Sequence, residues 1–240
     1  MAFNYTIDDI DQLDSPALVI YPELVRHNID LAIRMIGDVD RLRPHVKTHK
    51  SAEATRLMLD AGIRKFKCAT IAEAEMLGMC GAPDVLLAYQ PVGPKVQRFI
   101  AVIEKCPATQ FSCLTDDLSA AQAMAAAFAE RNLKVPVYID LNIGQNRTGI
   151  TPEAAFDLYA ACAAMNGIRP VGLQAYDGHI RSTDLKVRKA ACNAAFARVT
   201  SLKDELVEAG HPEPVIVAGG SPTFAIHAAR EQVECSPGTF

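Results

Sequence analysis

Basic and imidazole side chains are concentrated in residues 41–50, RLRPHVKTHK, although the 240-residue chain has a net charge of −4. Three kinds of site would use such a cluster: a nucleic-acid contact, a metal site built from histidines, or a lysine that binds a cofactor. A strand over residues 42–47 would place alternate side chains on one face. That face would carry Arg43, His45, Lys47 and His49.

Lys47 is the side chain of this cluster that is best suited to covalent chemistry. If Val46 packs outward against helices, Lys47 points into the interior of the sheet. A buried lysine is costly unless it is neutral or paired, and desolvation lowers its pKa toward the range of a nucleophilic amine. Most lysines instead extend their amine into solvent. The inward position nevertheless predicts a Schiff-base amine at Lys47.

An arginine follows the predicted strand 137–141, in the sequence VYIDLNIGQNRTGI. Arg147 stays protonated and offers a fixed fork of donors, which suits a carboxylate or phenolate oxygen. An ordinary turn with an exposed arginine would have the same pattern, and the spacing leaves both interpretations open.

Polar side chains are dense after the next predicted strand, 171–176, in the sequence GLQAYDGHI. They are Gln174, Tyr176, Asp177 and His179. Tyr176 suits stacking on a planar ring or hydrogen bonding to it. His179 suits acid–base catalysis, although a structural histidine fits the same residues equally well.

A glycine-rich turn follows the predicted strand 215–218, in the sequence VIVAGGSPTF. Two glycines let the backbone approach a ligand closely, and we expect Ser221 to cap a helix that starts at Pro222. Backbone amides at such a position bind phosphate. The residues of this predicted phosphate loop are Gly219, Gly220, Ser221, Pro222 and Thr223.

Strand-like and helix-like segments alternate along the chain, which predicts a parallel α/β sheet. The predicted strands are 42–47, 65–69, 85–89, 110–114, 137–141, 171–176, 215–218 and 233–236. The predicted helices are 22–36, 51–61, 71–80, 93–104, 117–131, 151–165, 183–209 and 222–230. Eight such units favour a (β/α)8 TIM barrel over an open doubly wound sheet, because no glycine-rich nucleotide motif is present. Active sites of these barrels lie at the carboxyl ends of the strands, where all four motifs fall.

Composition excludes several classes of protein. A pI near 5.9 argues against general nucleic-acid binding, and no apolar run is long enough to span a bilayer. The seven cysteines are scattered without a CxxC pair, and the acidic N-terminus does not resemble a signal peptide. We therefore expect reduced thiols and a cytoplasmic location.

An inward lysine, a phosphate loop, an arginine and a tyrosine on one rim together suit pyridoxal 5′-phosphate. The sequence also resembles the D-threonine aldolase/D-serine dehydratase family, whose fold is that of the alanine racemase N-terminal domain. The resemblance covers nearly the whole chain from about residue 13. It rests on LDSPALVIY, RLRPHVKTHKS, CATIAEAEML, IDLNIGQNRTGI, QAYDGHI and GGSPTF.

The resemblance implies that Lys47 binds the cofactor covalently, that residues 219–223 hold its phosphate, and that Arg147 and Tyr176 contact the cofactor ring and substrate. We also assign His45, Gln145 and Pro222 to the predicted cofactor site, and His179 to catalysis. Family members act on small D-amino acids as homodimers. They bind a divalent metal (Zn or Mn) through a C-terminal β-domain, which we expect to be missing here and to pair with a leading strand within residues 1–21.

The predicted reaction is cleavage of a D-3-hydroxy-amino acid to glycine and an aldehyde. Dehydration of D-serine or 3-hydroxy-D-aspartate, and racemisation, use the same cofactor and stay open. A non-catalytic pyridoxal-phosphate carrier is an alternative from another class of protein. A metal-binding barrel that uses His45 and His49 is a further alternative.

Overall fold

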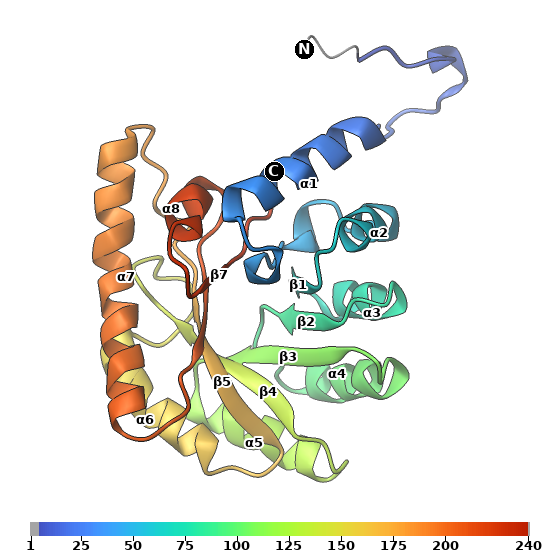
Figure 1. Cartoon of the computed structure of the whole chain (residues 1–240). Helices are drawn as coiled ribbons and strands as arrows, with labels where there is room; N and C mark the ends of the chain where they lie inside the picture. The colour runs from blue at the N-terminus through green and yellow to red at the C-terminus, as the bar shows by residue number, and fades with distance from the viewer. Residues whose placement is uncertain (1–4, 240) are drawn as a thin grey trace.

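The computed structural model describes residues 5–239, which form a seven-stranded parallel sheet in the order β1-β2-β3-β4-β5-β6-β7 (Figure 1). The strands are β1 (Lys65–Cys68), β2 (Asp84–Leu87), β3 (Gln110–Thr115), β4 (Val135–Leu141), β5 (Ile168–Ala175), β6 (Val215–Ala218) and β7 (Val233–Cys235). The helices are α1 (Pro22–Ile36), α2 (Ala52–Asp60), α3 (Ile71–Met79), α4 (Pro94–Lys105), α5 (Leu118–Ala129), α6 (Pro152–Ala163), α7 (Leu185–Glu208) and α8 (Phe224–Ala228). Seven of the predicted strands are therefore confirmed, and a helix lies in each predicted helical range.

Local side-chain hydrogen bonds explain where several helices begin. The Ser51 hydroxyl accepts a hydrogen bond from the amide of Ala54, as expected for the N-cap of α2. Thr70 does the same for the amide of Glu73 at the start of α3. The Glu73 carboxylate accepts from the amide of Ala69, one residue earlier than in a standard capping box. These contacts fix the starts of α2 and α3.

The predicted first strand, residues 42–47, is not a strand. Leu42 makes an isolated parallel bridge with Cys235 of β7, and His45 makes another with Lys67 of β1. The segment therefore joins the two edge strands of the sheet through single bridges where a continuous ladder was expected.

Pro44 and the geometry that follows it explain the interruption. Pro44 has no amide hydrogen to donate, although its carbonyl accepts from the amide of Lys67. The chain then turns into a 3-10 helix at Val46–Thr48. Strand alternation therefore does not apply at Lys47, and its direction is set by this turn.

Helices surround the sheet as a continuous outer layer. Each helix from α1 to α7 contacts the next, α1 also contacts α8, and α7 contacts the 3-10 helix η4 (Ser221–Thr223) before α8. Residues 17–21 form no strand and belong to the N-terminal segment that projects away from this body (Figure 1). Their pairing with a C-terminal domain stays a prediction.

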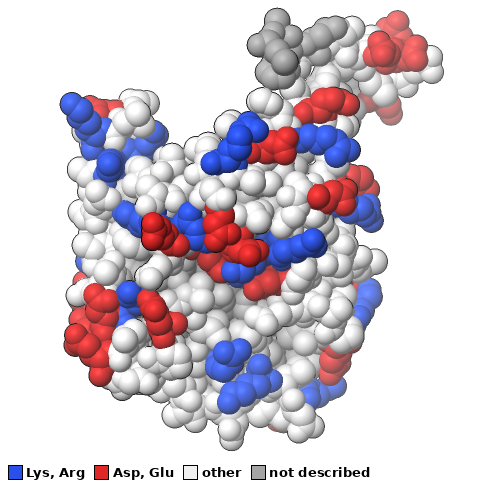
Figure 2. All heavy atoms as spheres, in the orientation of Figure 1, with Lys and Arg blue, Asp and Glu red and all other residues white. Residues whose placement is uncertain are grey.

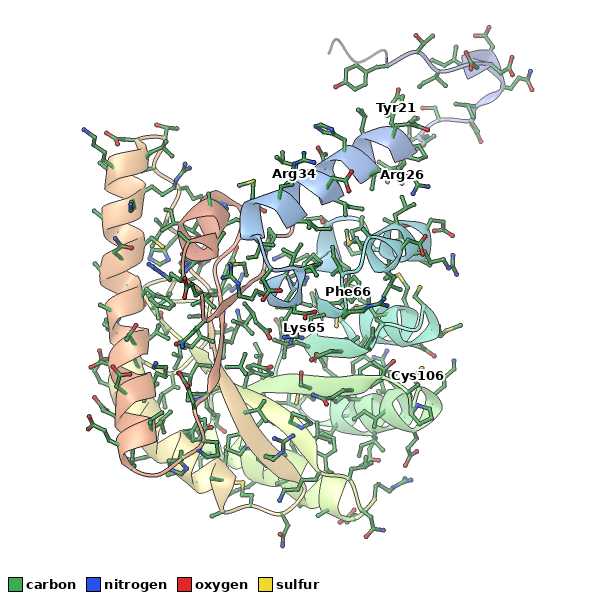
Figure 3. The ribbon with its side chains drawn as sticks, in the orientation of Figure 1. Tyr21, Arg26, Arg34, Lys65, Phe66 and Cys106 are labelled. Atoms are coloured by element: carbon green, nitrogen blue, oxygen red, sulfur yellow. The ribbon has the colours of Figure 1, made fainter. Side chains whose placement is uncertain are left out.

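The side chains inside the curved sheet form layers, called levels below, at successive positions from the amino to the carboxyl ends of the strands. The middle level is apolar and contains Leu86, Leu114, Tyr138 and Val217. Below it, at the amino ends of the strands, is a level of paired charges. Lys65, labelled with Phe66 near the centre of Figure 3, binds Glu234 there.

Arg43 is the centre of that lower level and is only 1 % exposed. Its guanidinium contacts Asp84 at 2.6 Å and Glu234 at 2.7 Å. Arg41 also turns away from the predicted site, because its guanidinium donates to the carbonyls of Ile36 and Arg230, each at 2.6 Å. Two cations of the basic segment thus stabilise the fold, and Arg43 does not share the site of Lys47 as a common strand face would predict.

The face of the molecule in Figure 2 carries charges of both signs. Lys and Arg side chains are interspersed with Asp and Glu over the mostly uncharged face in Figure 2. Within residues 5–239, no helix combines the length and apolar character needed to cross a bilayer.

Candidate active site

Lys47, Arg147 and Tyr176 converge at the carboxyl ends of the strands. Lys47 Nζ lies 5.6 Å from the centroid of the Tyr176 ring, and Arg147 Cζ lies 5.3 Å from the same centroid. The three residues come from the 3-10 helix after residue 45, the loop after β4 and the loop after β5. The structure therefore brings together three of the residues selected from sequence.

The charge state of Lys47 is shifted toward the neutral amine. Burial lowers its pKa, the Arg147 guanidinium lowers it further, and the Glu73 carboxylate opposes the change. His45 lies beside it, and its Nδ1 accepts from the amide of Lys47 at 3.3 Å. Burial, with the charges of Lys67 and Lys47, lowers the pKa of His45 to about 2, so His45 is a neutral imidazole that fixes the turn.

Hydrogen bonds within the loop between β4 and α6 position Arg147. Asn142 Oδ1 accepts from the amides of Gly144 and Asn146, both at 3.1 Å. The Thr148 hydroxyl donates to Asp140 Oδ2 at 2.9 Å. Asn146 has a φ of +51°, a left-handed conformation that asparagine tolerates better than most residues. Arg147 is thereby held at the rim with its side chain exposed to an incoming ligand.

Asp140 is expected to make the free energy of unfolding depend on pH. Burial raises its pKa from 3.8 to about 6, and the hydrogen bond from Thr148 opposes this. Because the folded state holds this proton more tightly, stability is lost as pH rises through that window. We expect Asp140→Asn to stabilise the protein by on the order of 2–3 kcal/mol near neutral pH and by much less near pH ~4.

Urea unfolding of Asp140→Asn and wild type at both pH values checks this expectation. Asp157→Asn is the matched control, because Asp157 is exposed on α6 and should change stability at neither pH. A difference between Asp140→Asn and wild type that does not grow with pH would contradict the assignment.

Tyr176 is held in place by two glycines. A Cβ on Gly178 would lie 2.3 Å from Tyr176 Cζ, and one on Gly220 would lie 3.0 Å from its Cε2. His179 lies farther out at the rim, where a Cβ on Gly144 would lie 2.7 Å from its Nε2. His179 is exposed, so it can reach a ligand only from the solvent side of the site.

The phosphate loop differs in detail from the prediction. Ser221 does not cap a helix: its Oγ accepts from the amides of Gly238 and Thr239, at 3.1 and 2.9 Å. The helix that follows, α8, has only five residues. The amides of Gly219 and Gly220 donate to the Ala175 carbonyl and the Thr223 hydroxyl, so an anion at this loop would have to displace such partners, and it would not meet the N-terminus of a long helix.

A buried cluster supports the same loop from below. The Thr223 hydroxyl donates to Asp177 Oδ1 at 2.7 Å, and His227 Nε2 lies 2.9 Å from Asp177 Oδ2. Burial raises the pKa of Asp177, but the hydrogen bonds from His227, Thr223 and Cys192, with the charge of His227, together lower it. Gly219 has a φ of +74°, and a Cβ there would lie 2.6 Å from His227 Cδ2. A larger residue at Gly219 would therefore displace the loop.

Cys192 completes this cluster, with Sγ 3.3 Å from His227 Nε2. Within residues 5–239, Asp177, Cys192 and His227 are the one group of three potential metal ligands, and Asp177 and His227 are joined by a hydrogen bond. His45 and His49 belong to no such group; each Nδ1 accepts a backbone amide hydrogen bond. The metal-binding barrel built on these two histidines is therefore not supported.

Orphaned polar atoms at the mouth indicate that a polar ligand belongs there. Gln145 Oε1, Gln174 Oε1 and Ser236 Oγ are buried without a hydrogen-bond partner. Native proteins rarely leave such atoms unsatisfied. Together with the Lys47 amine, they fit a planar phosphorylated aldehyde such as pyridoxal phosphate.

Sequence reasoning did not select three residues that contact the predicted site residues: Lys67, Gly238 and Thr239. Lys67 is buried beside His45, with which it forms a backbone bridge. Its signal was the pattern KFKC over residues 65–68, whose alternation places both lysines on one face. Gly238 and Thr239 join the phosphate loop from a distant segment, which no local pattern predicts.

A sequence comparison that covers all of these residues identifies the family. The model of the alanine racemase N-terminal domain matches residues 20–240. The chain belongs to this family. The match includes Lys47, Arg147, Tyr176 and both segments of the phosphate loop.

Three proteins that are similar to this chain are named for their enzymatic activity. The chain is 30 % identical to the 3-hydroxy-D-aspartate aldolase of Paracoccus denitrificans over 221 residues, which are 88 % of this chain and 55 % of the relative. It is 28 % identical to the D-threo-3-hydroxyaspartate dehydratase of a Delftia species, over 93 % of this chain and 59 % of the relative. The crystal structure of D-threonine aldolase from Filomicrobium marinum superposes with a TM-score of 0.86 at 26 % identity, over 94 % of this chain and 62 % of that one. The chain thus spans less than two thirds of these proteins.

Proposed function

We propose that this protein is a pyridoxal-phosphate-dependent lyase that cleaves D-3-hydroxy-amino acids to glycine and an aldehyde. The observation that carries the proposal is the convergence of the Lys47 amine and the Arg147 guanidinium on the ring of Tyr176. The names of the relatives, two aldolases and a dehydratase of 3-hydroxy-D-amino acids, support the substrate class. Residues 42–45 then take the place of the first strand of an eight-unit barrel.

Each residue has a role that follows from its chemistry. Lys47, with its lowered pKa, is the amine that holds the cofactor aldehyde, and the Tyr176 ring supports the pyridine ring beside it. Arg147 donates to an anionic oxygen of cofactor or substrate. The bound cofactor supplies an electron sink for the electrons released at Cα.

The phosphate is placed at the loop around Ser221, and the Asp177–His227 pair supports this loop. His179, exposed at the rim, is the residue placed to accept the substrate hydroxyl proton from the solvent side. We also propose a homodimer and a divalent metal, with ligands other than the Asp177 cluster.

Product analysis tests the proposal. Purified protein with pyridoxal phosphate and a divalent cation is incubated with D-threonine and with 3-hydroxy-D-aspartate. Cleavage yields glycine and an aldehyde. Dehydration, which the Delftia relative favours, yields a 2-oxo acid and ammonia, and racemisation yields only the inverted amino acid. Bound cofactor without turnover of either substrate would contradict the enzyme proposal and favour the carrier.

A further inference from the structure

The inward face of β1 carries two lysines in closely similar backbone settings. Side chains alternate along a strand, so Lys65 and Lys67 share one face. Phe66 and Cys68 lie on the opposite face, in the core between sheet and helices. The two lysines differ in the charges around their amines.

At the lower level the positive charges have partners within the chain. Lys65 Nζ binds Glu234, and Arg43 binds both Glu234 and Asp84. Burial of these cations is therefore compensated, and the lower level needs no ligand.

At the upper level Lys67 has no such partner. It is 2 % exposed, yet its Nζ makes no ion pair or hydrogen bond with any residue from 5 to 239. The nearest charges include Lys47, which repels it, and Asp140 and Asp177, which attract it without reaching it. Burial, together with Lys47, lowers the pKa of Lys67 to about 7.

The upper level also contains other polar groups that are able to bind a ligand. Gln174 Oε1 is buried and unpartnered, and Arg147 and Lys47 face the same mouth. A lysine this deeply placed, with no carboxylate paired to its amine, is costly to keep unless water or a ligand at the mouth supplies an acceptor.

We propose that Lys67 is a second ligand-binding amine of this site, which donates a hydrogen bond from Nζ to an oxyanion of the bound ligand. The inference rests on the proposed function. The oxyanion has two sources there: the phenolate of the cofactor or the carboxylate of the substrate. Lys47 holds the ligand covalently, whereas Lys67 orients it through charge.

Binding measurements on cofactor-free protein test this role. The variant Lys67→Met keeps an unbranched apolar stem and removes the amine, and Lys65→Met is the matched control on the same face. Loss of a charge-assisted hydrogen bond is expected to weaken binding about 10- to 100-fold. Dissociation constants are measured for pyridoxal phosphate alone, and then for D-serine added to the loaded protein.

The two arms separate the sources of the oxyanion. Weaker binding of pyridoxal phosphate to Lys67→Met, with Lys65→Met unchanged, assigns the contact to the cofactor. Normal cofactor binding with weaker D-serine binding assigns it to the substrate. Proton uptake on ligand binding near pH ~7, seen with an indicator dye and reduced in Lys67→Met, would support either assignment.

Equal binding of both ligands by wild type and Lys67→Met would overturn the inference while leaving the proposed function intact. A wild-type protein that binds no pyridoxal phosphate would overturn both. If Lys67→Met does not fold, as judged by circular dichroism, Lys67→Gln replaces it, with the same expected loss of binding and the same contradicting result.

Discussion

Replacing Lys47 by alanine is expected to abolish covalent attachment of pyridoxal phosphate and to reduce turnover by about 10³-fold or more. The lysine both holds the cofactor and moves protons near it, and a positioned acid–base group alone contributes roughly 10²–10⁴-fold. Its half-buried amine beside Arg147 is already biased toward the neutral form.

The control for this variant is Lys50→Ala. Lys50 lies three residues away on the same turn and is exposed, so its loss should leave cofactor binding and turnover unchanged. The absorbance of the protein-bound cofactor and the rate of product formation are the two measurements. Retention of the cofactor chromophore in Lys47→Ala would show that another amine holds it.

Replacing Arg43 by methionine is expected to cost about 3–5 kcal/mol of stability. The change leaves Asp84 without its buried partner and removes one of the two cations that bind Glu234. Cofactor affinity in the protein that remains folded should be nearly unchanged, because Arg43 lies in the level below the apolar one.

Urea unfolding measures the free energy of unfolding of Arg43→Met and of its control, Arg56→Met. Arg56 is exposed and forms a 3.7 Å pair with Glu53 on α2, which should contribute less than about 1 kcal/mol. Equal effects of the two substitutions would refute the account of the lower level. A large loss of cofactor affinity in folded Arg43→Met would place this arginine in the site instead.

The elements that the sequence predicts well are those with a local cause. The runs at 85–89 and 215–218 are apolar and bounded by turns, and they become β2 and β6. Ser51 and Thr70 cap the helices that they precede. Clustering of the loops follows from parallel strands, whose carboxyl ends meet at one edge of the sheet.

The failures have one local and several non-local causes. Residues 42–47 have strand-like composition, but Pro44 and the 3-10 turn at Val46–Thr48 leave only isolated bridges. The sequence grouped Arg43 with the site residues because no local pattern indicates its true partners. These partners, Asp84 and Glu234, are 41 and 191 residues away in the chain.

The same limit applies to the site itself. Lys47 was selected for an inward position on a strand, whereas that description fits Lys67, and Lys47 reaches the mouth from a 3-10 turn. The phosphate loop was predicted from its glycines, but its contacts with Gly238 and Thr239, in the segment after β7, were not. Residue types and spacing thus predict which loops form the site, whereas tertiary contacts determine which side chains lie in it.

The most direct test of the central claim is borohydride reduction of the protein with bound pyridoxal phosphate, followed by digestion and mass spectrometry. Reduction makes the attachment permanent, so the modified peptide identifies the amine. The account predicts a single adduct on Lys47. An adduct on Lys67, the other buried lysine of the site, or no adduct at all, would contradict it.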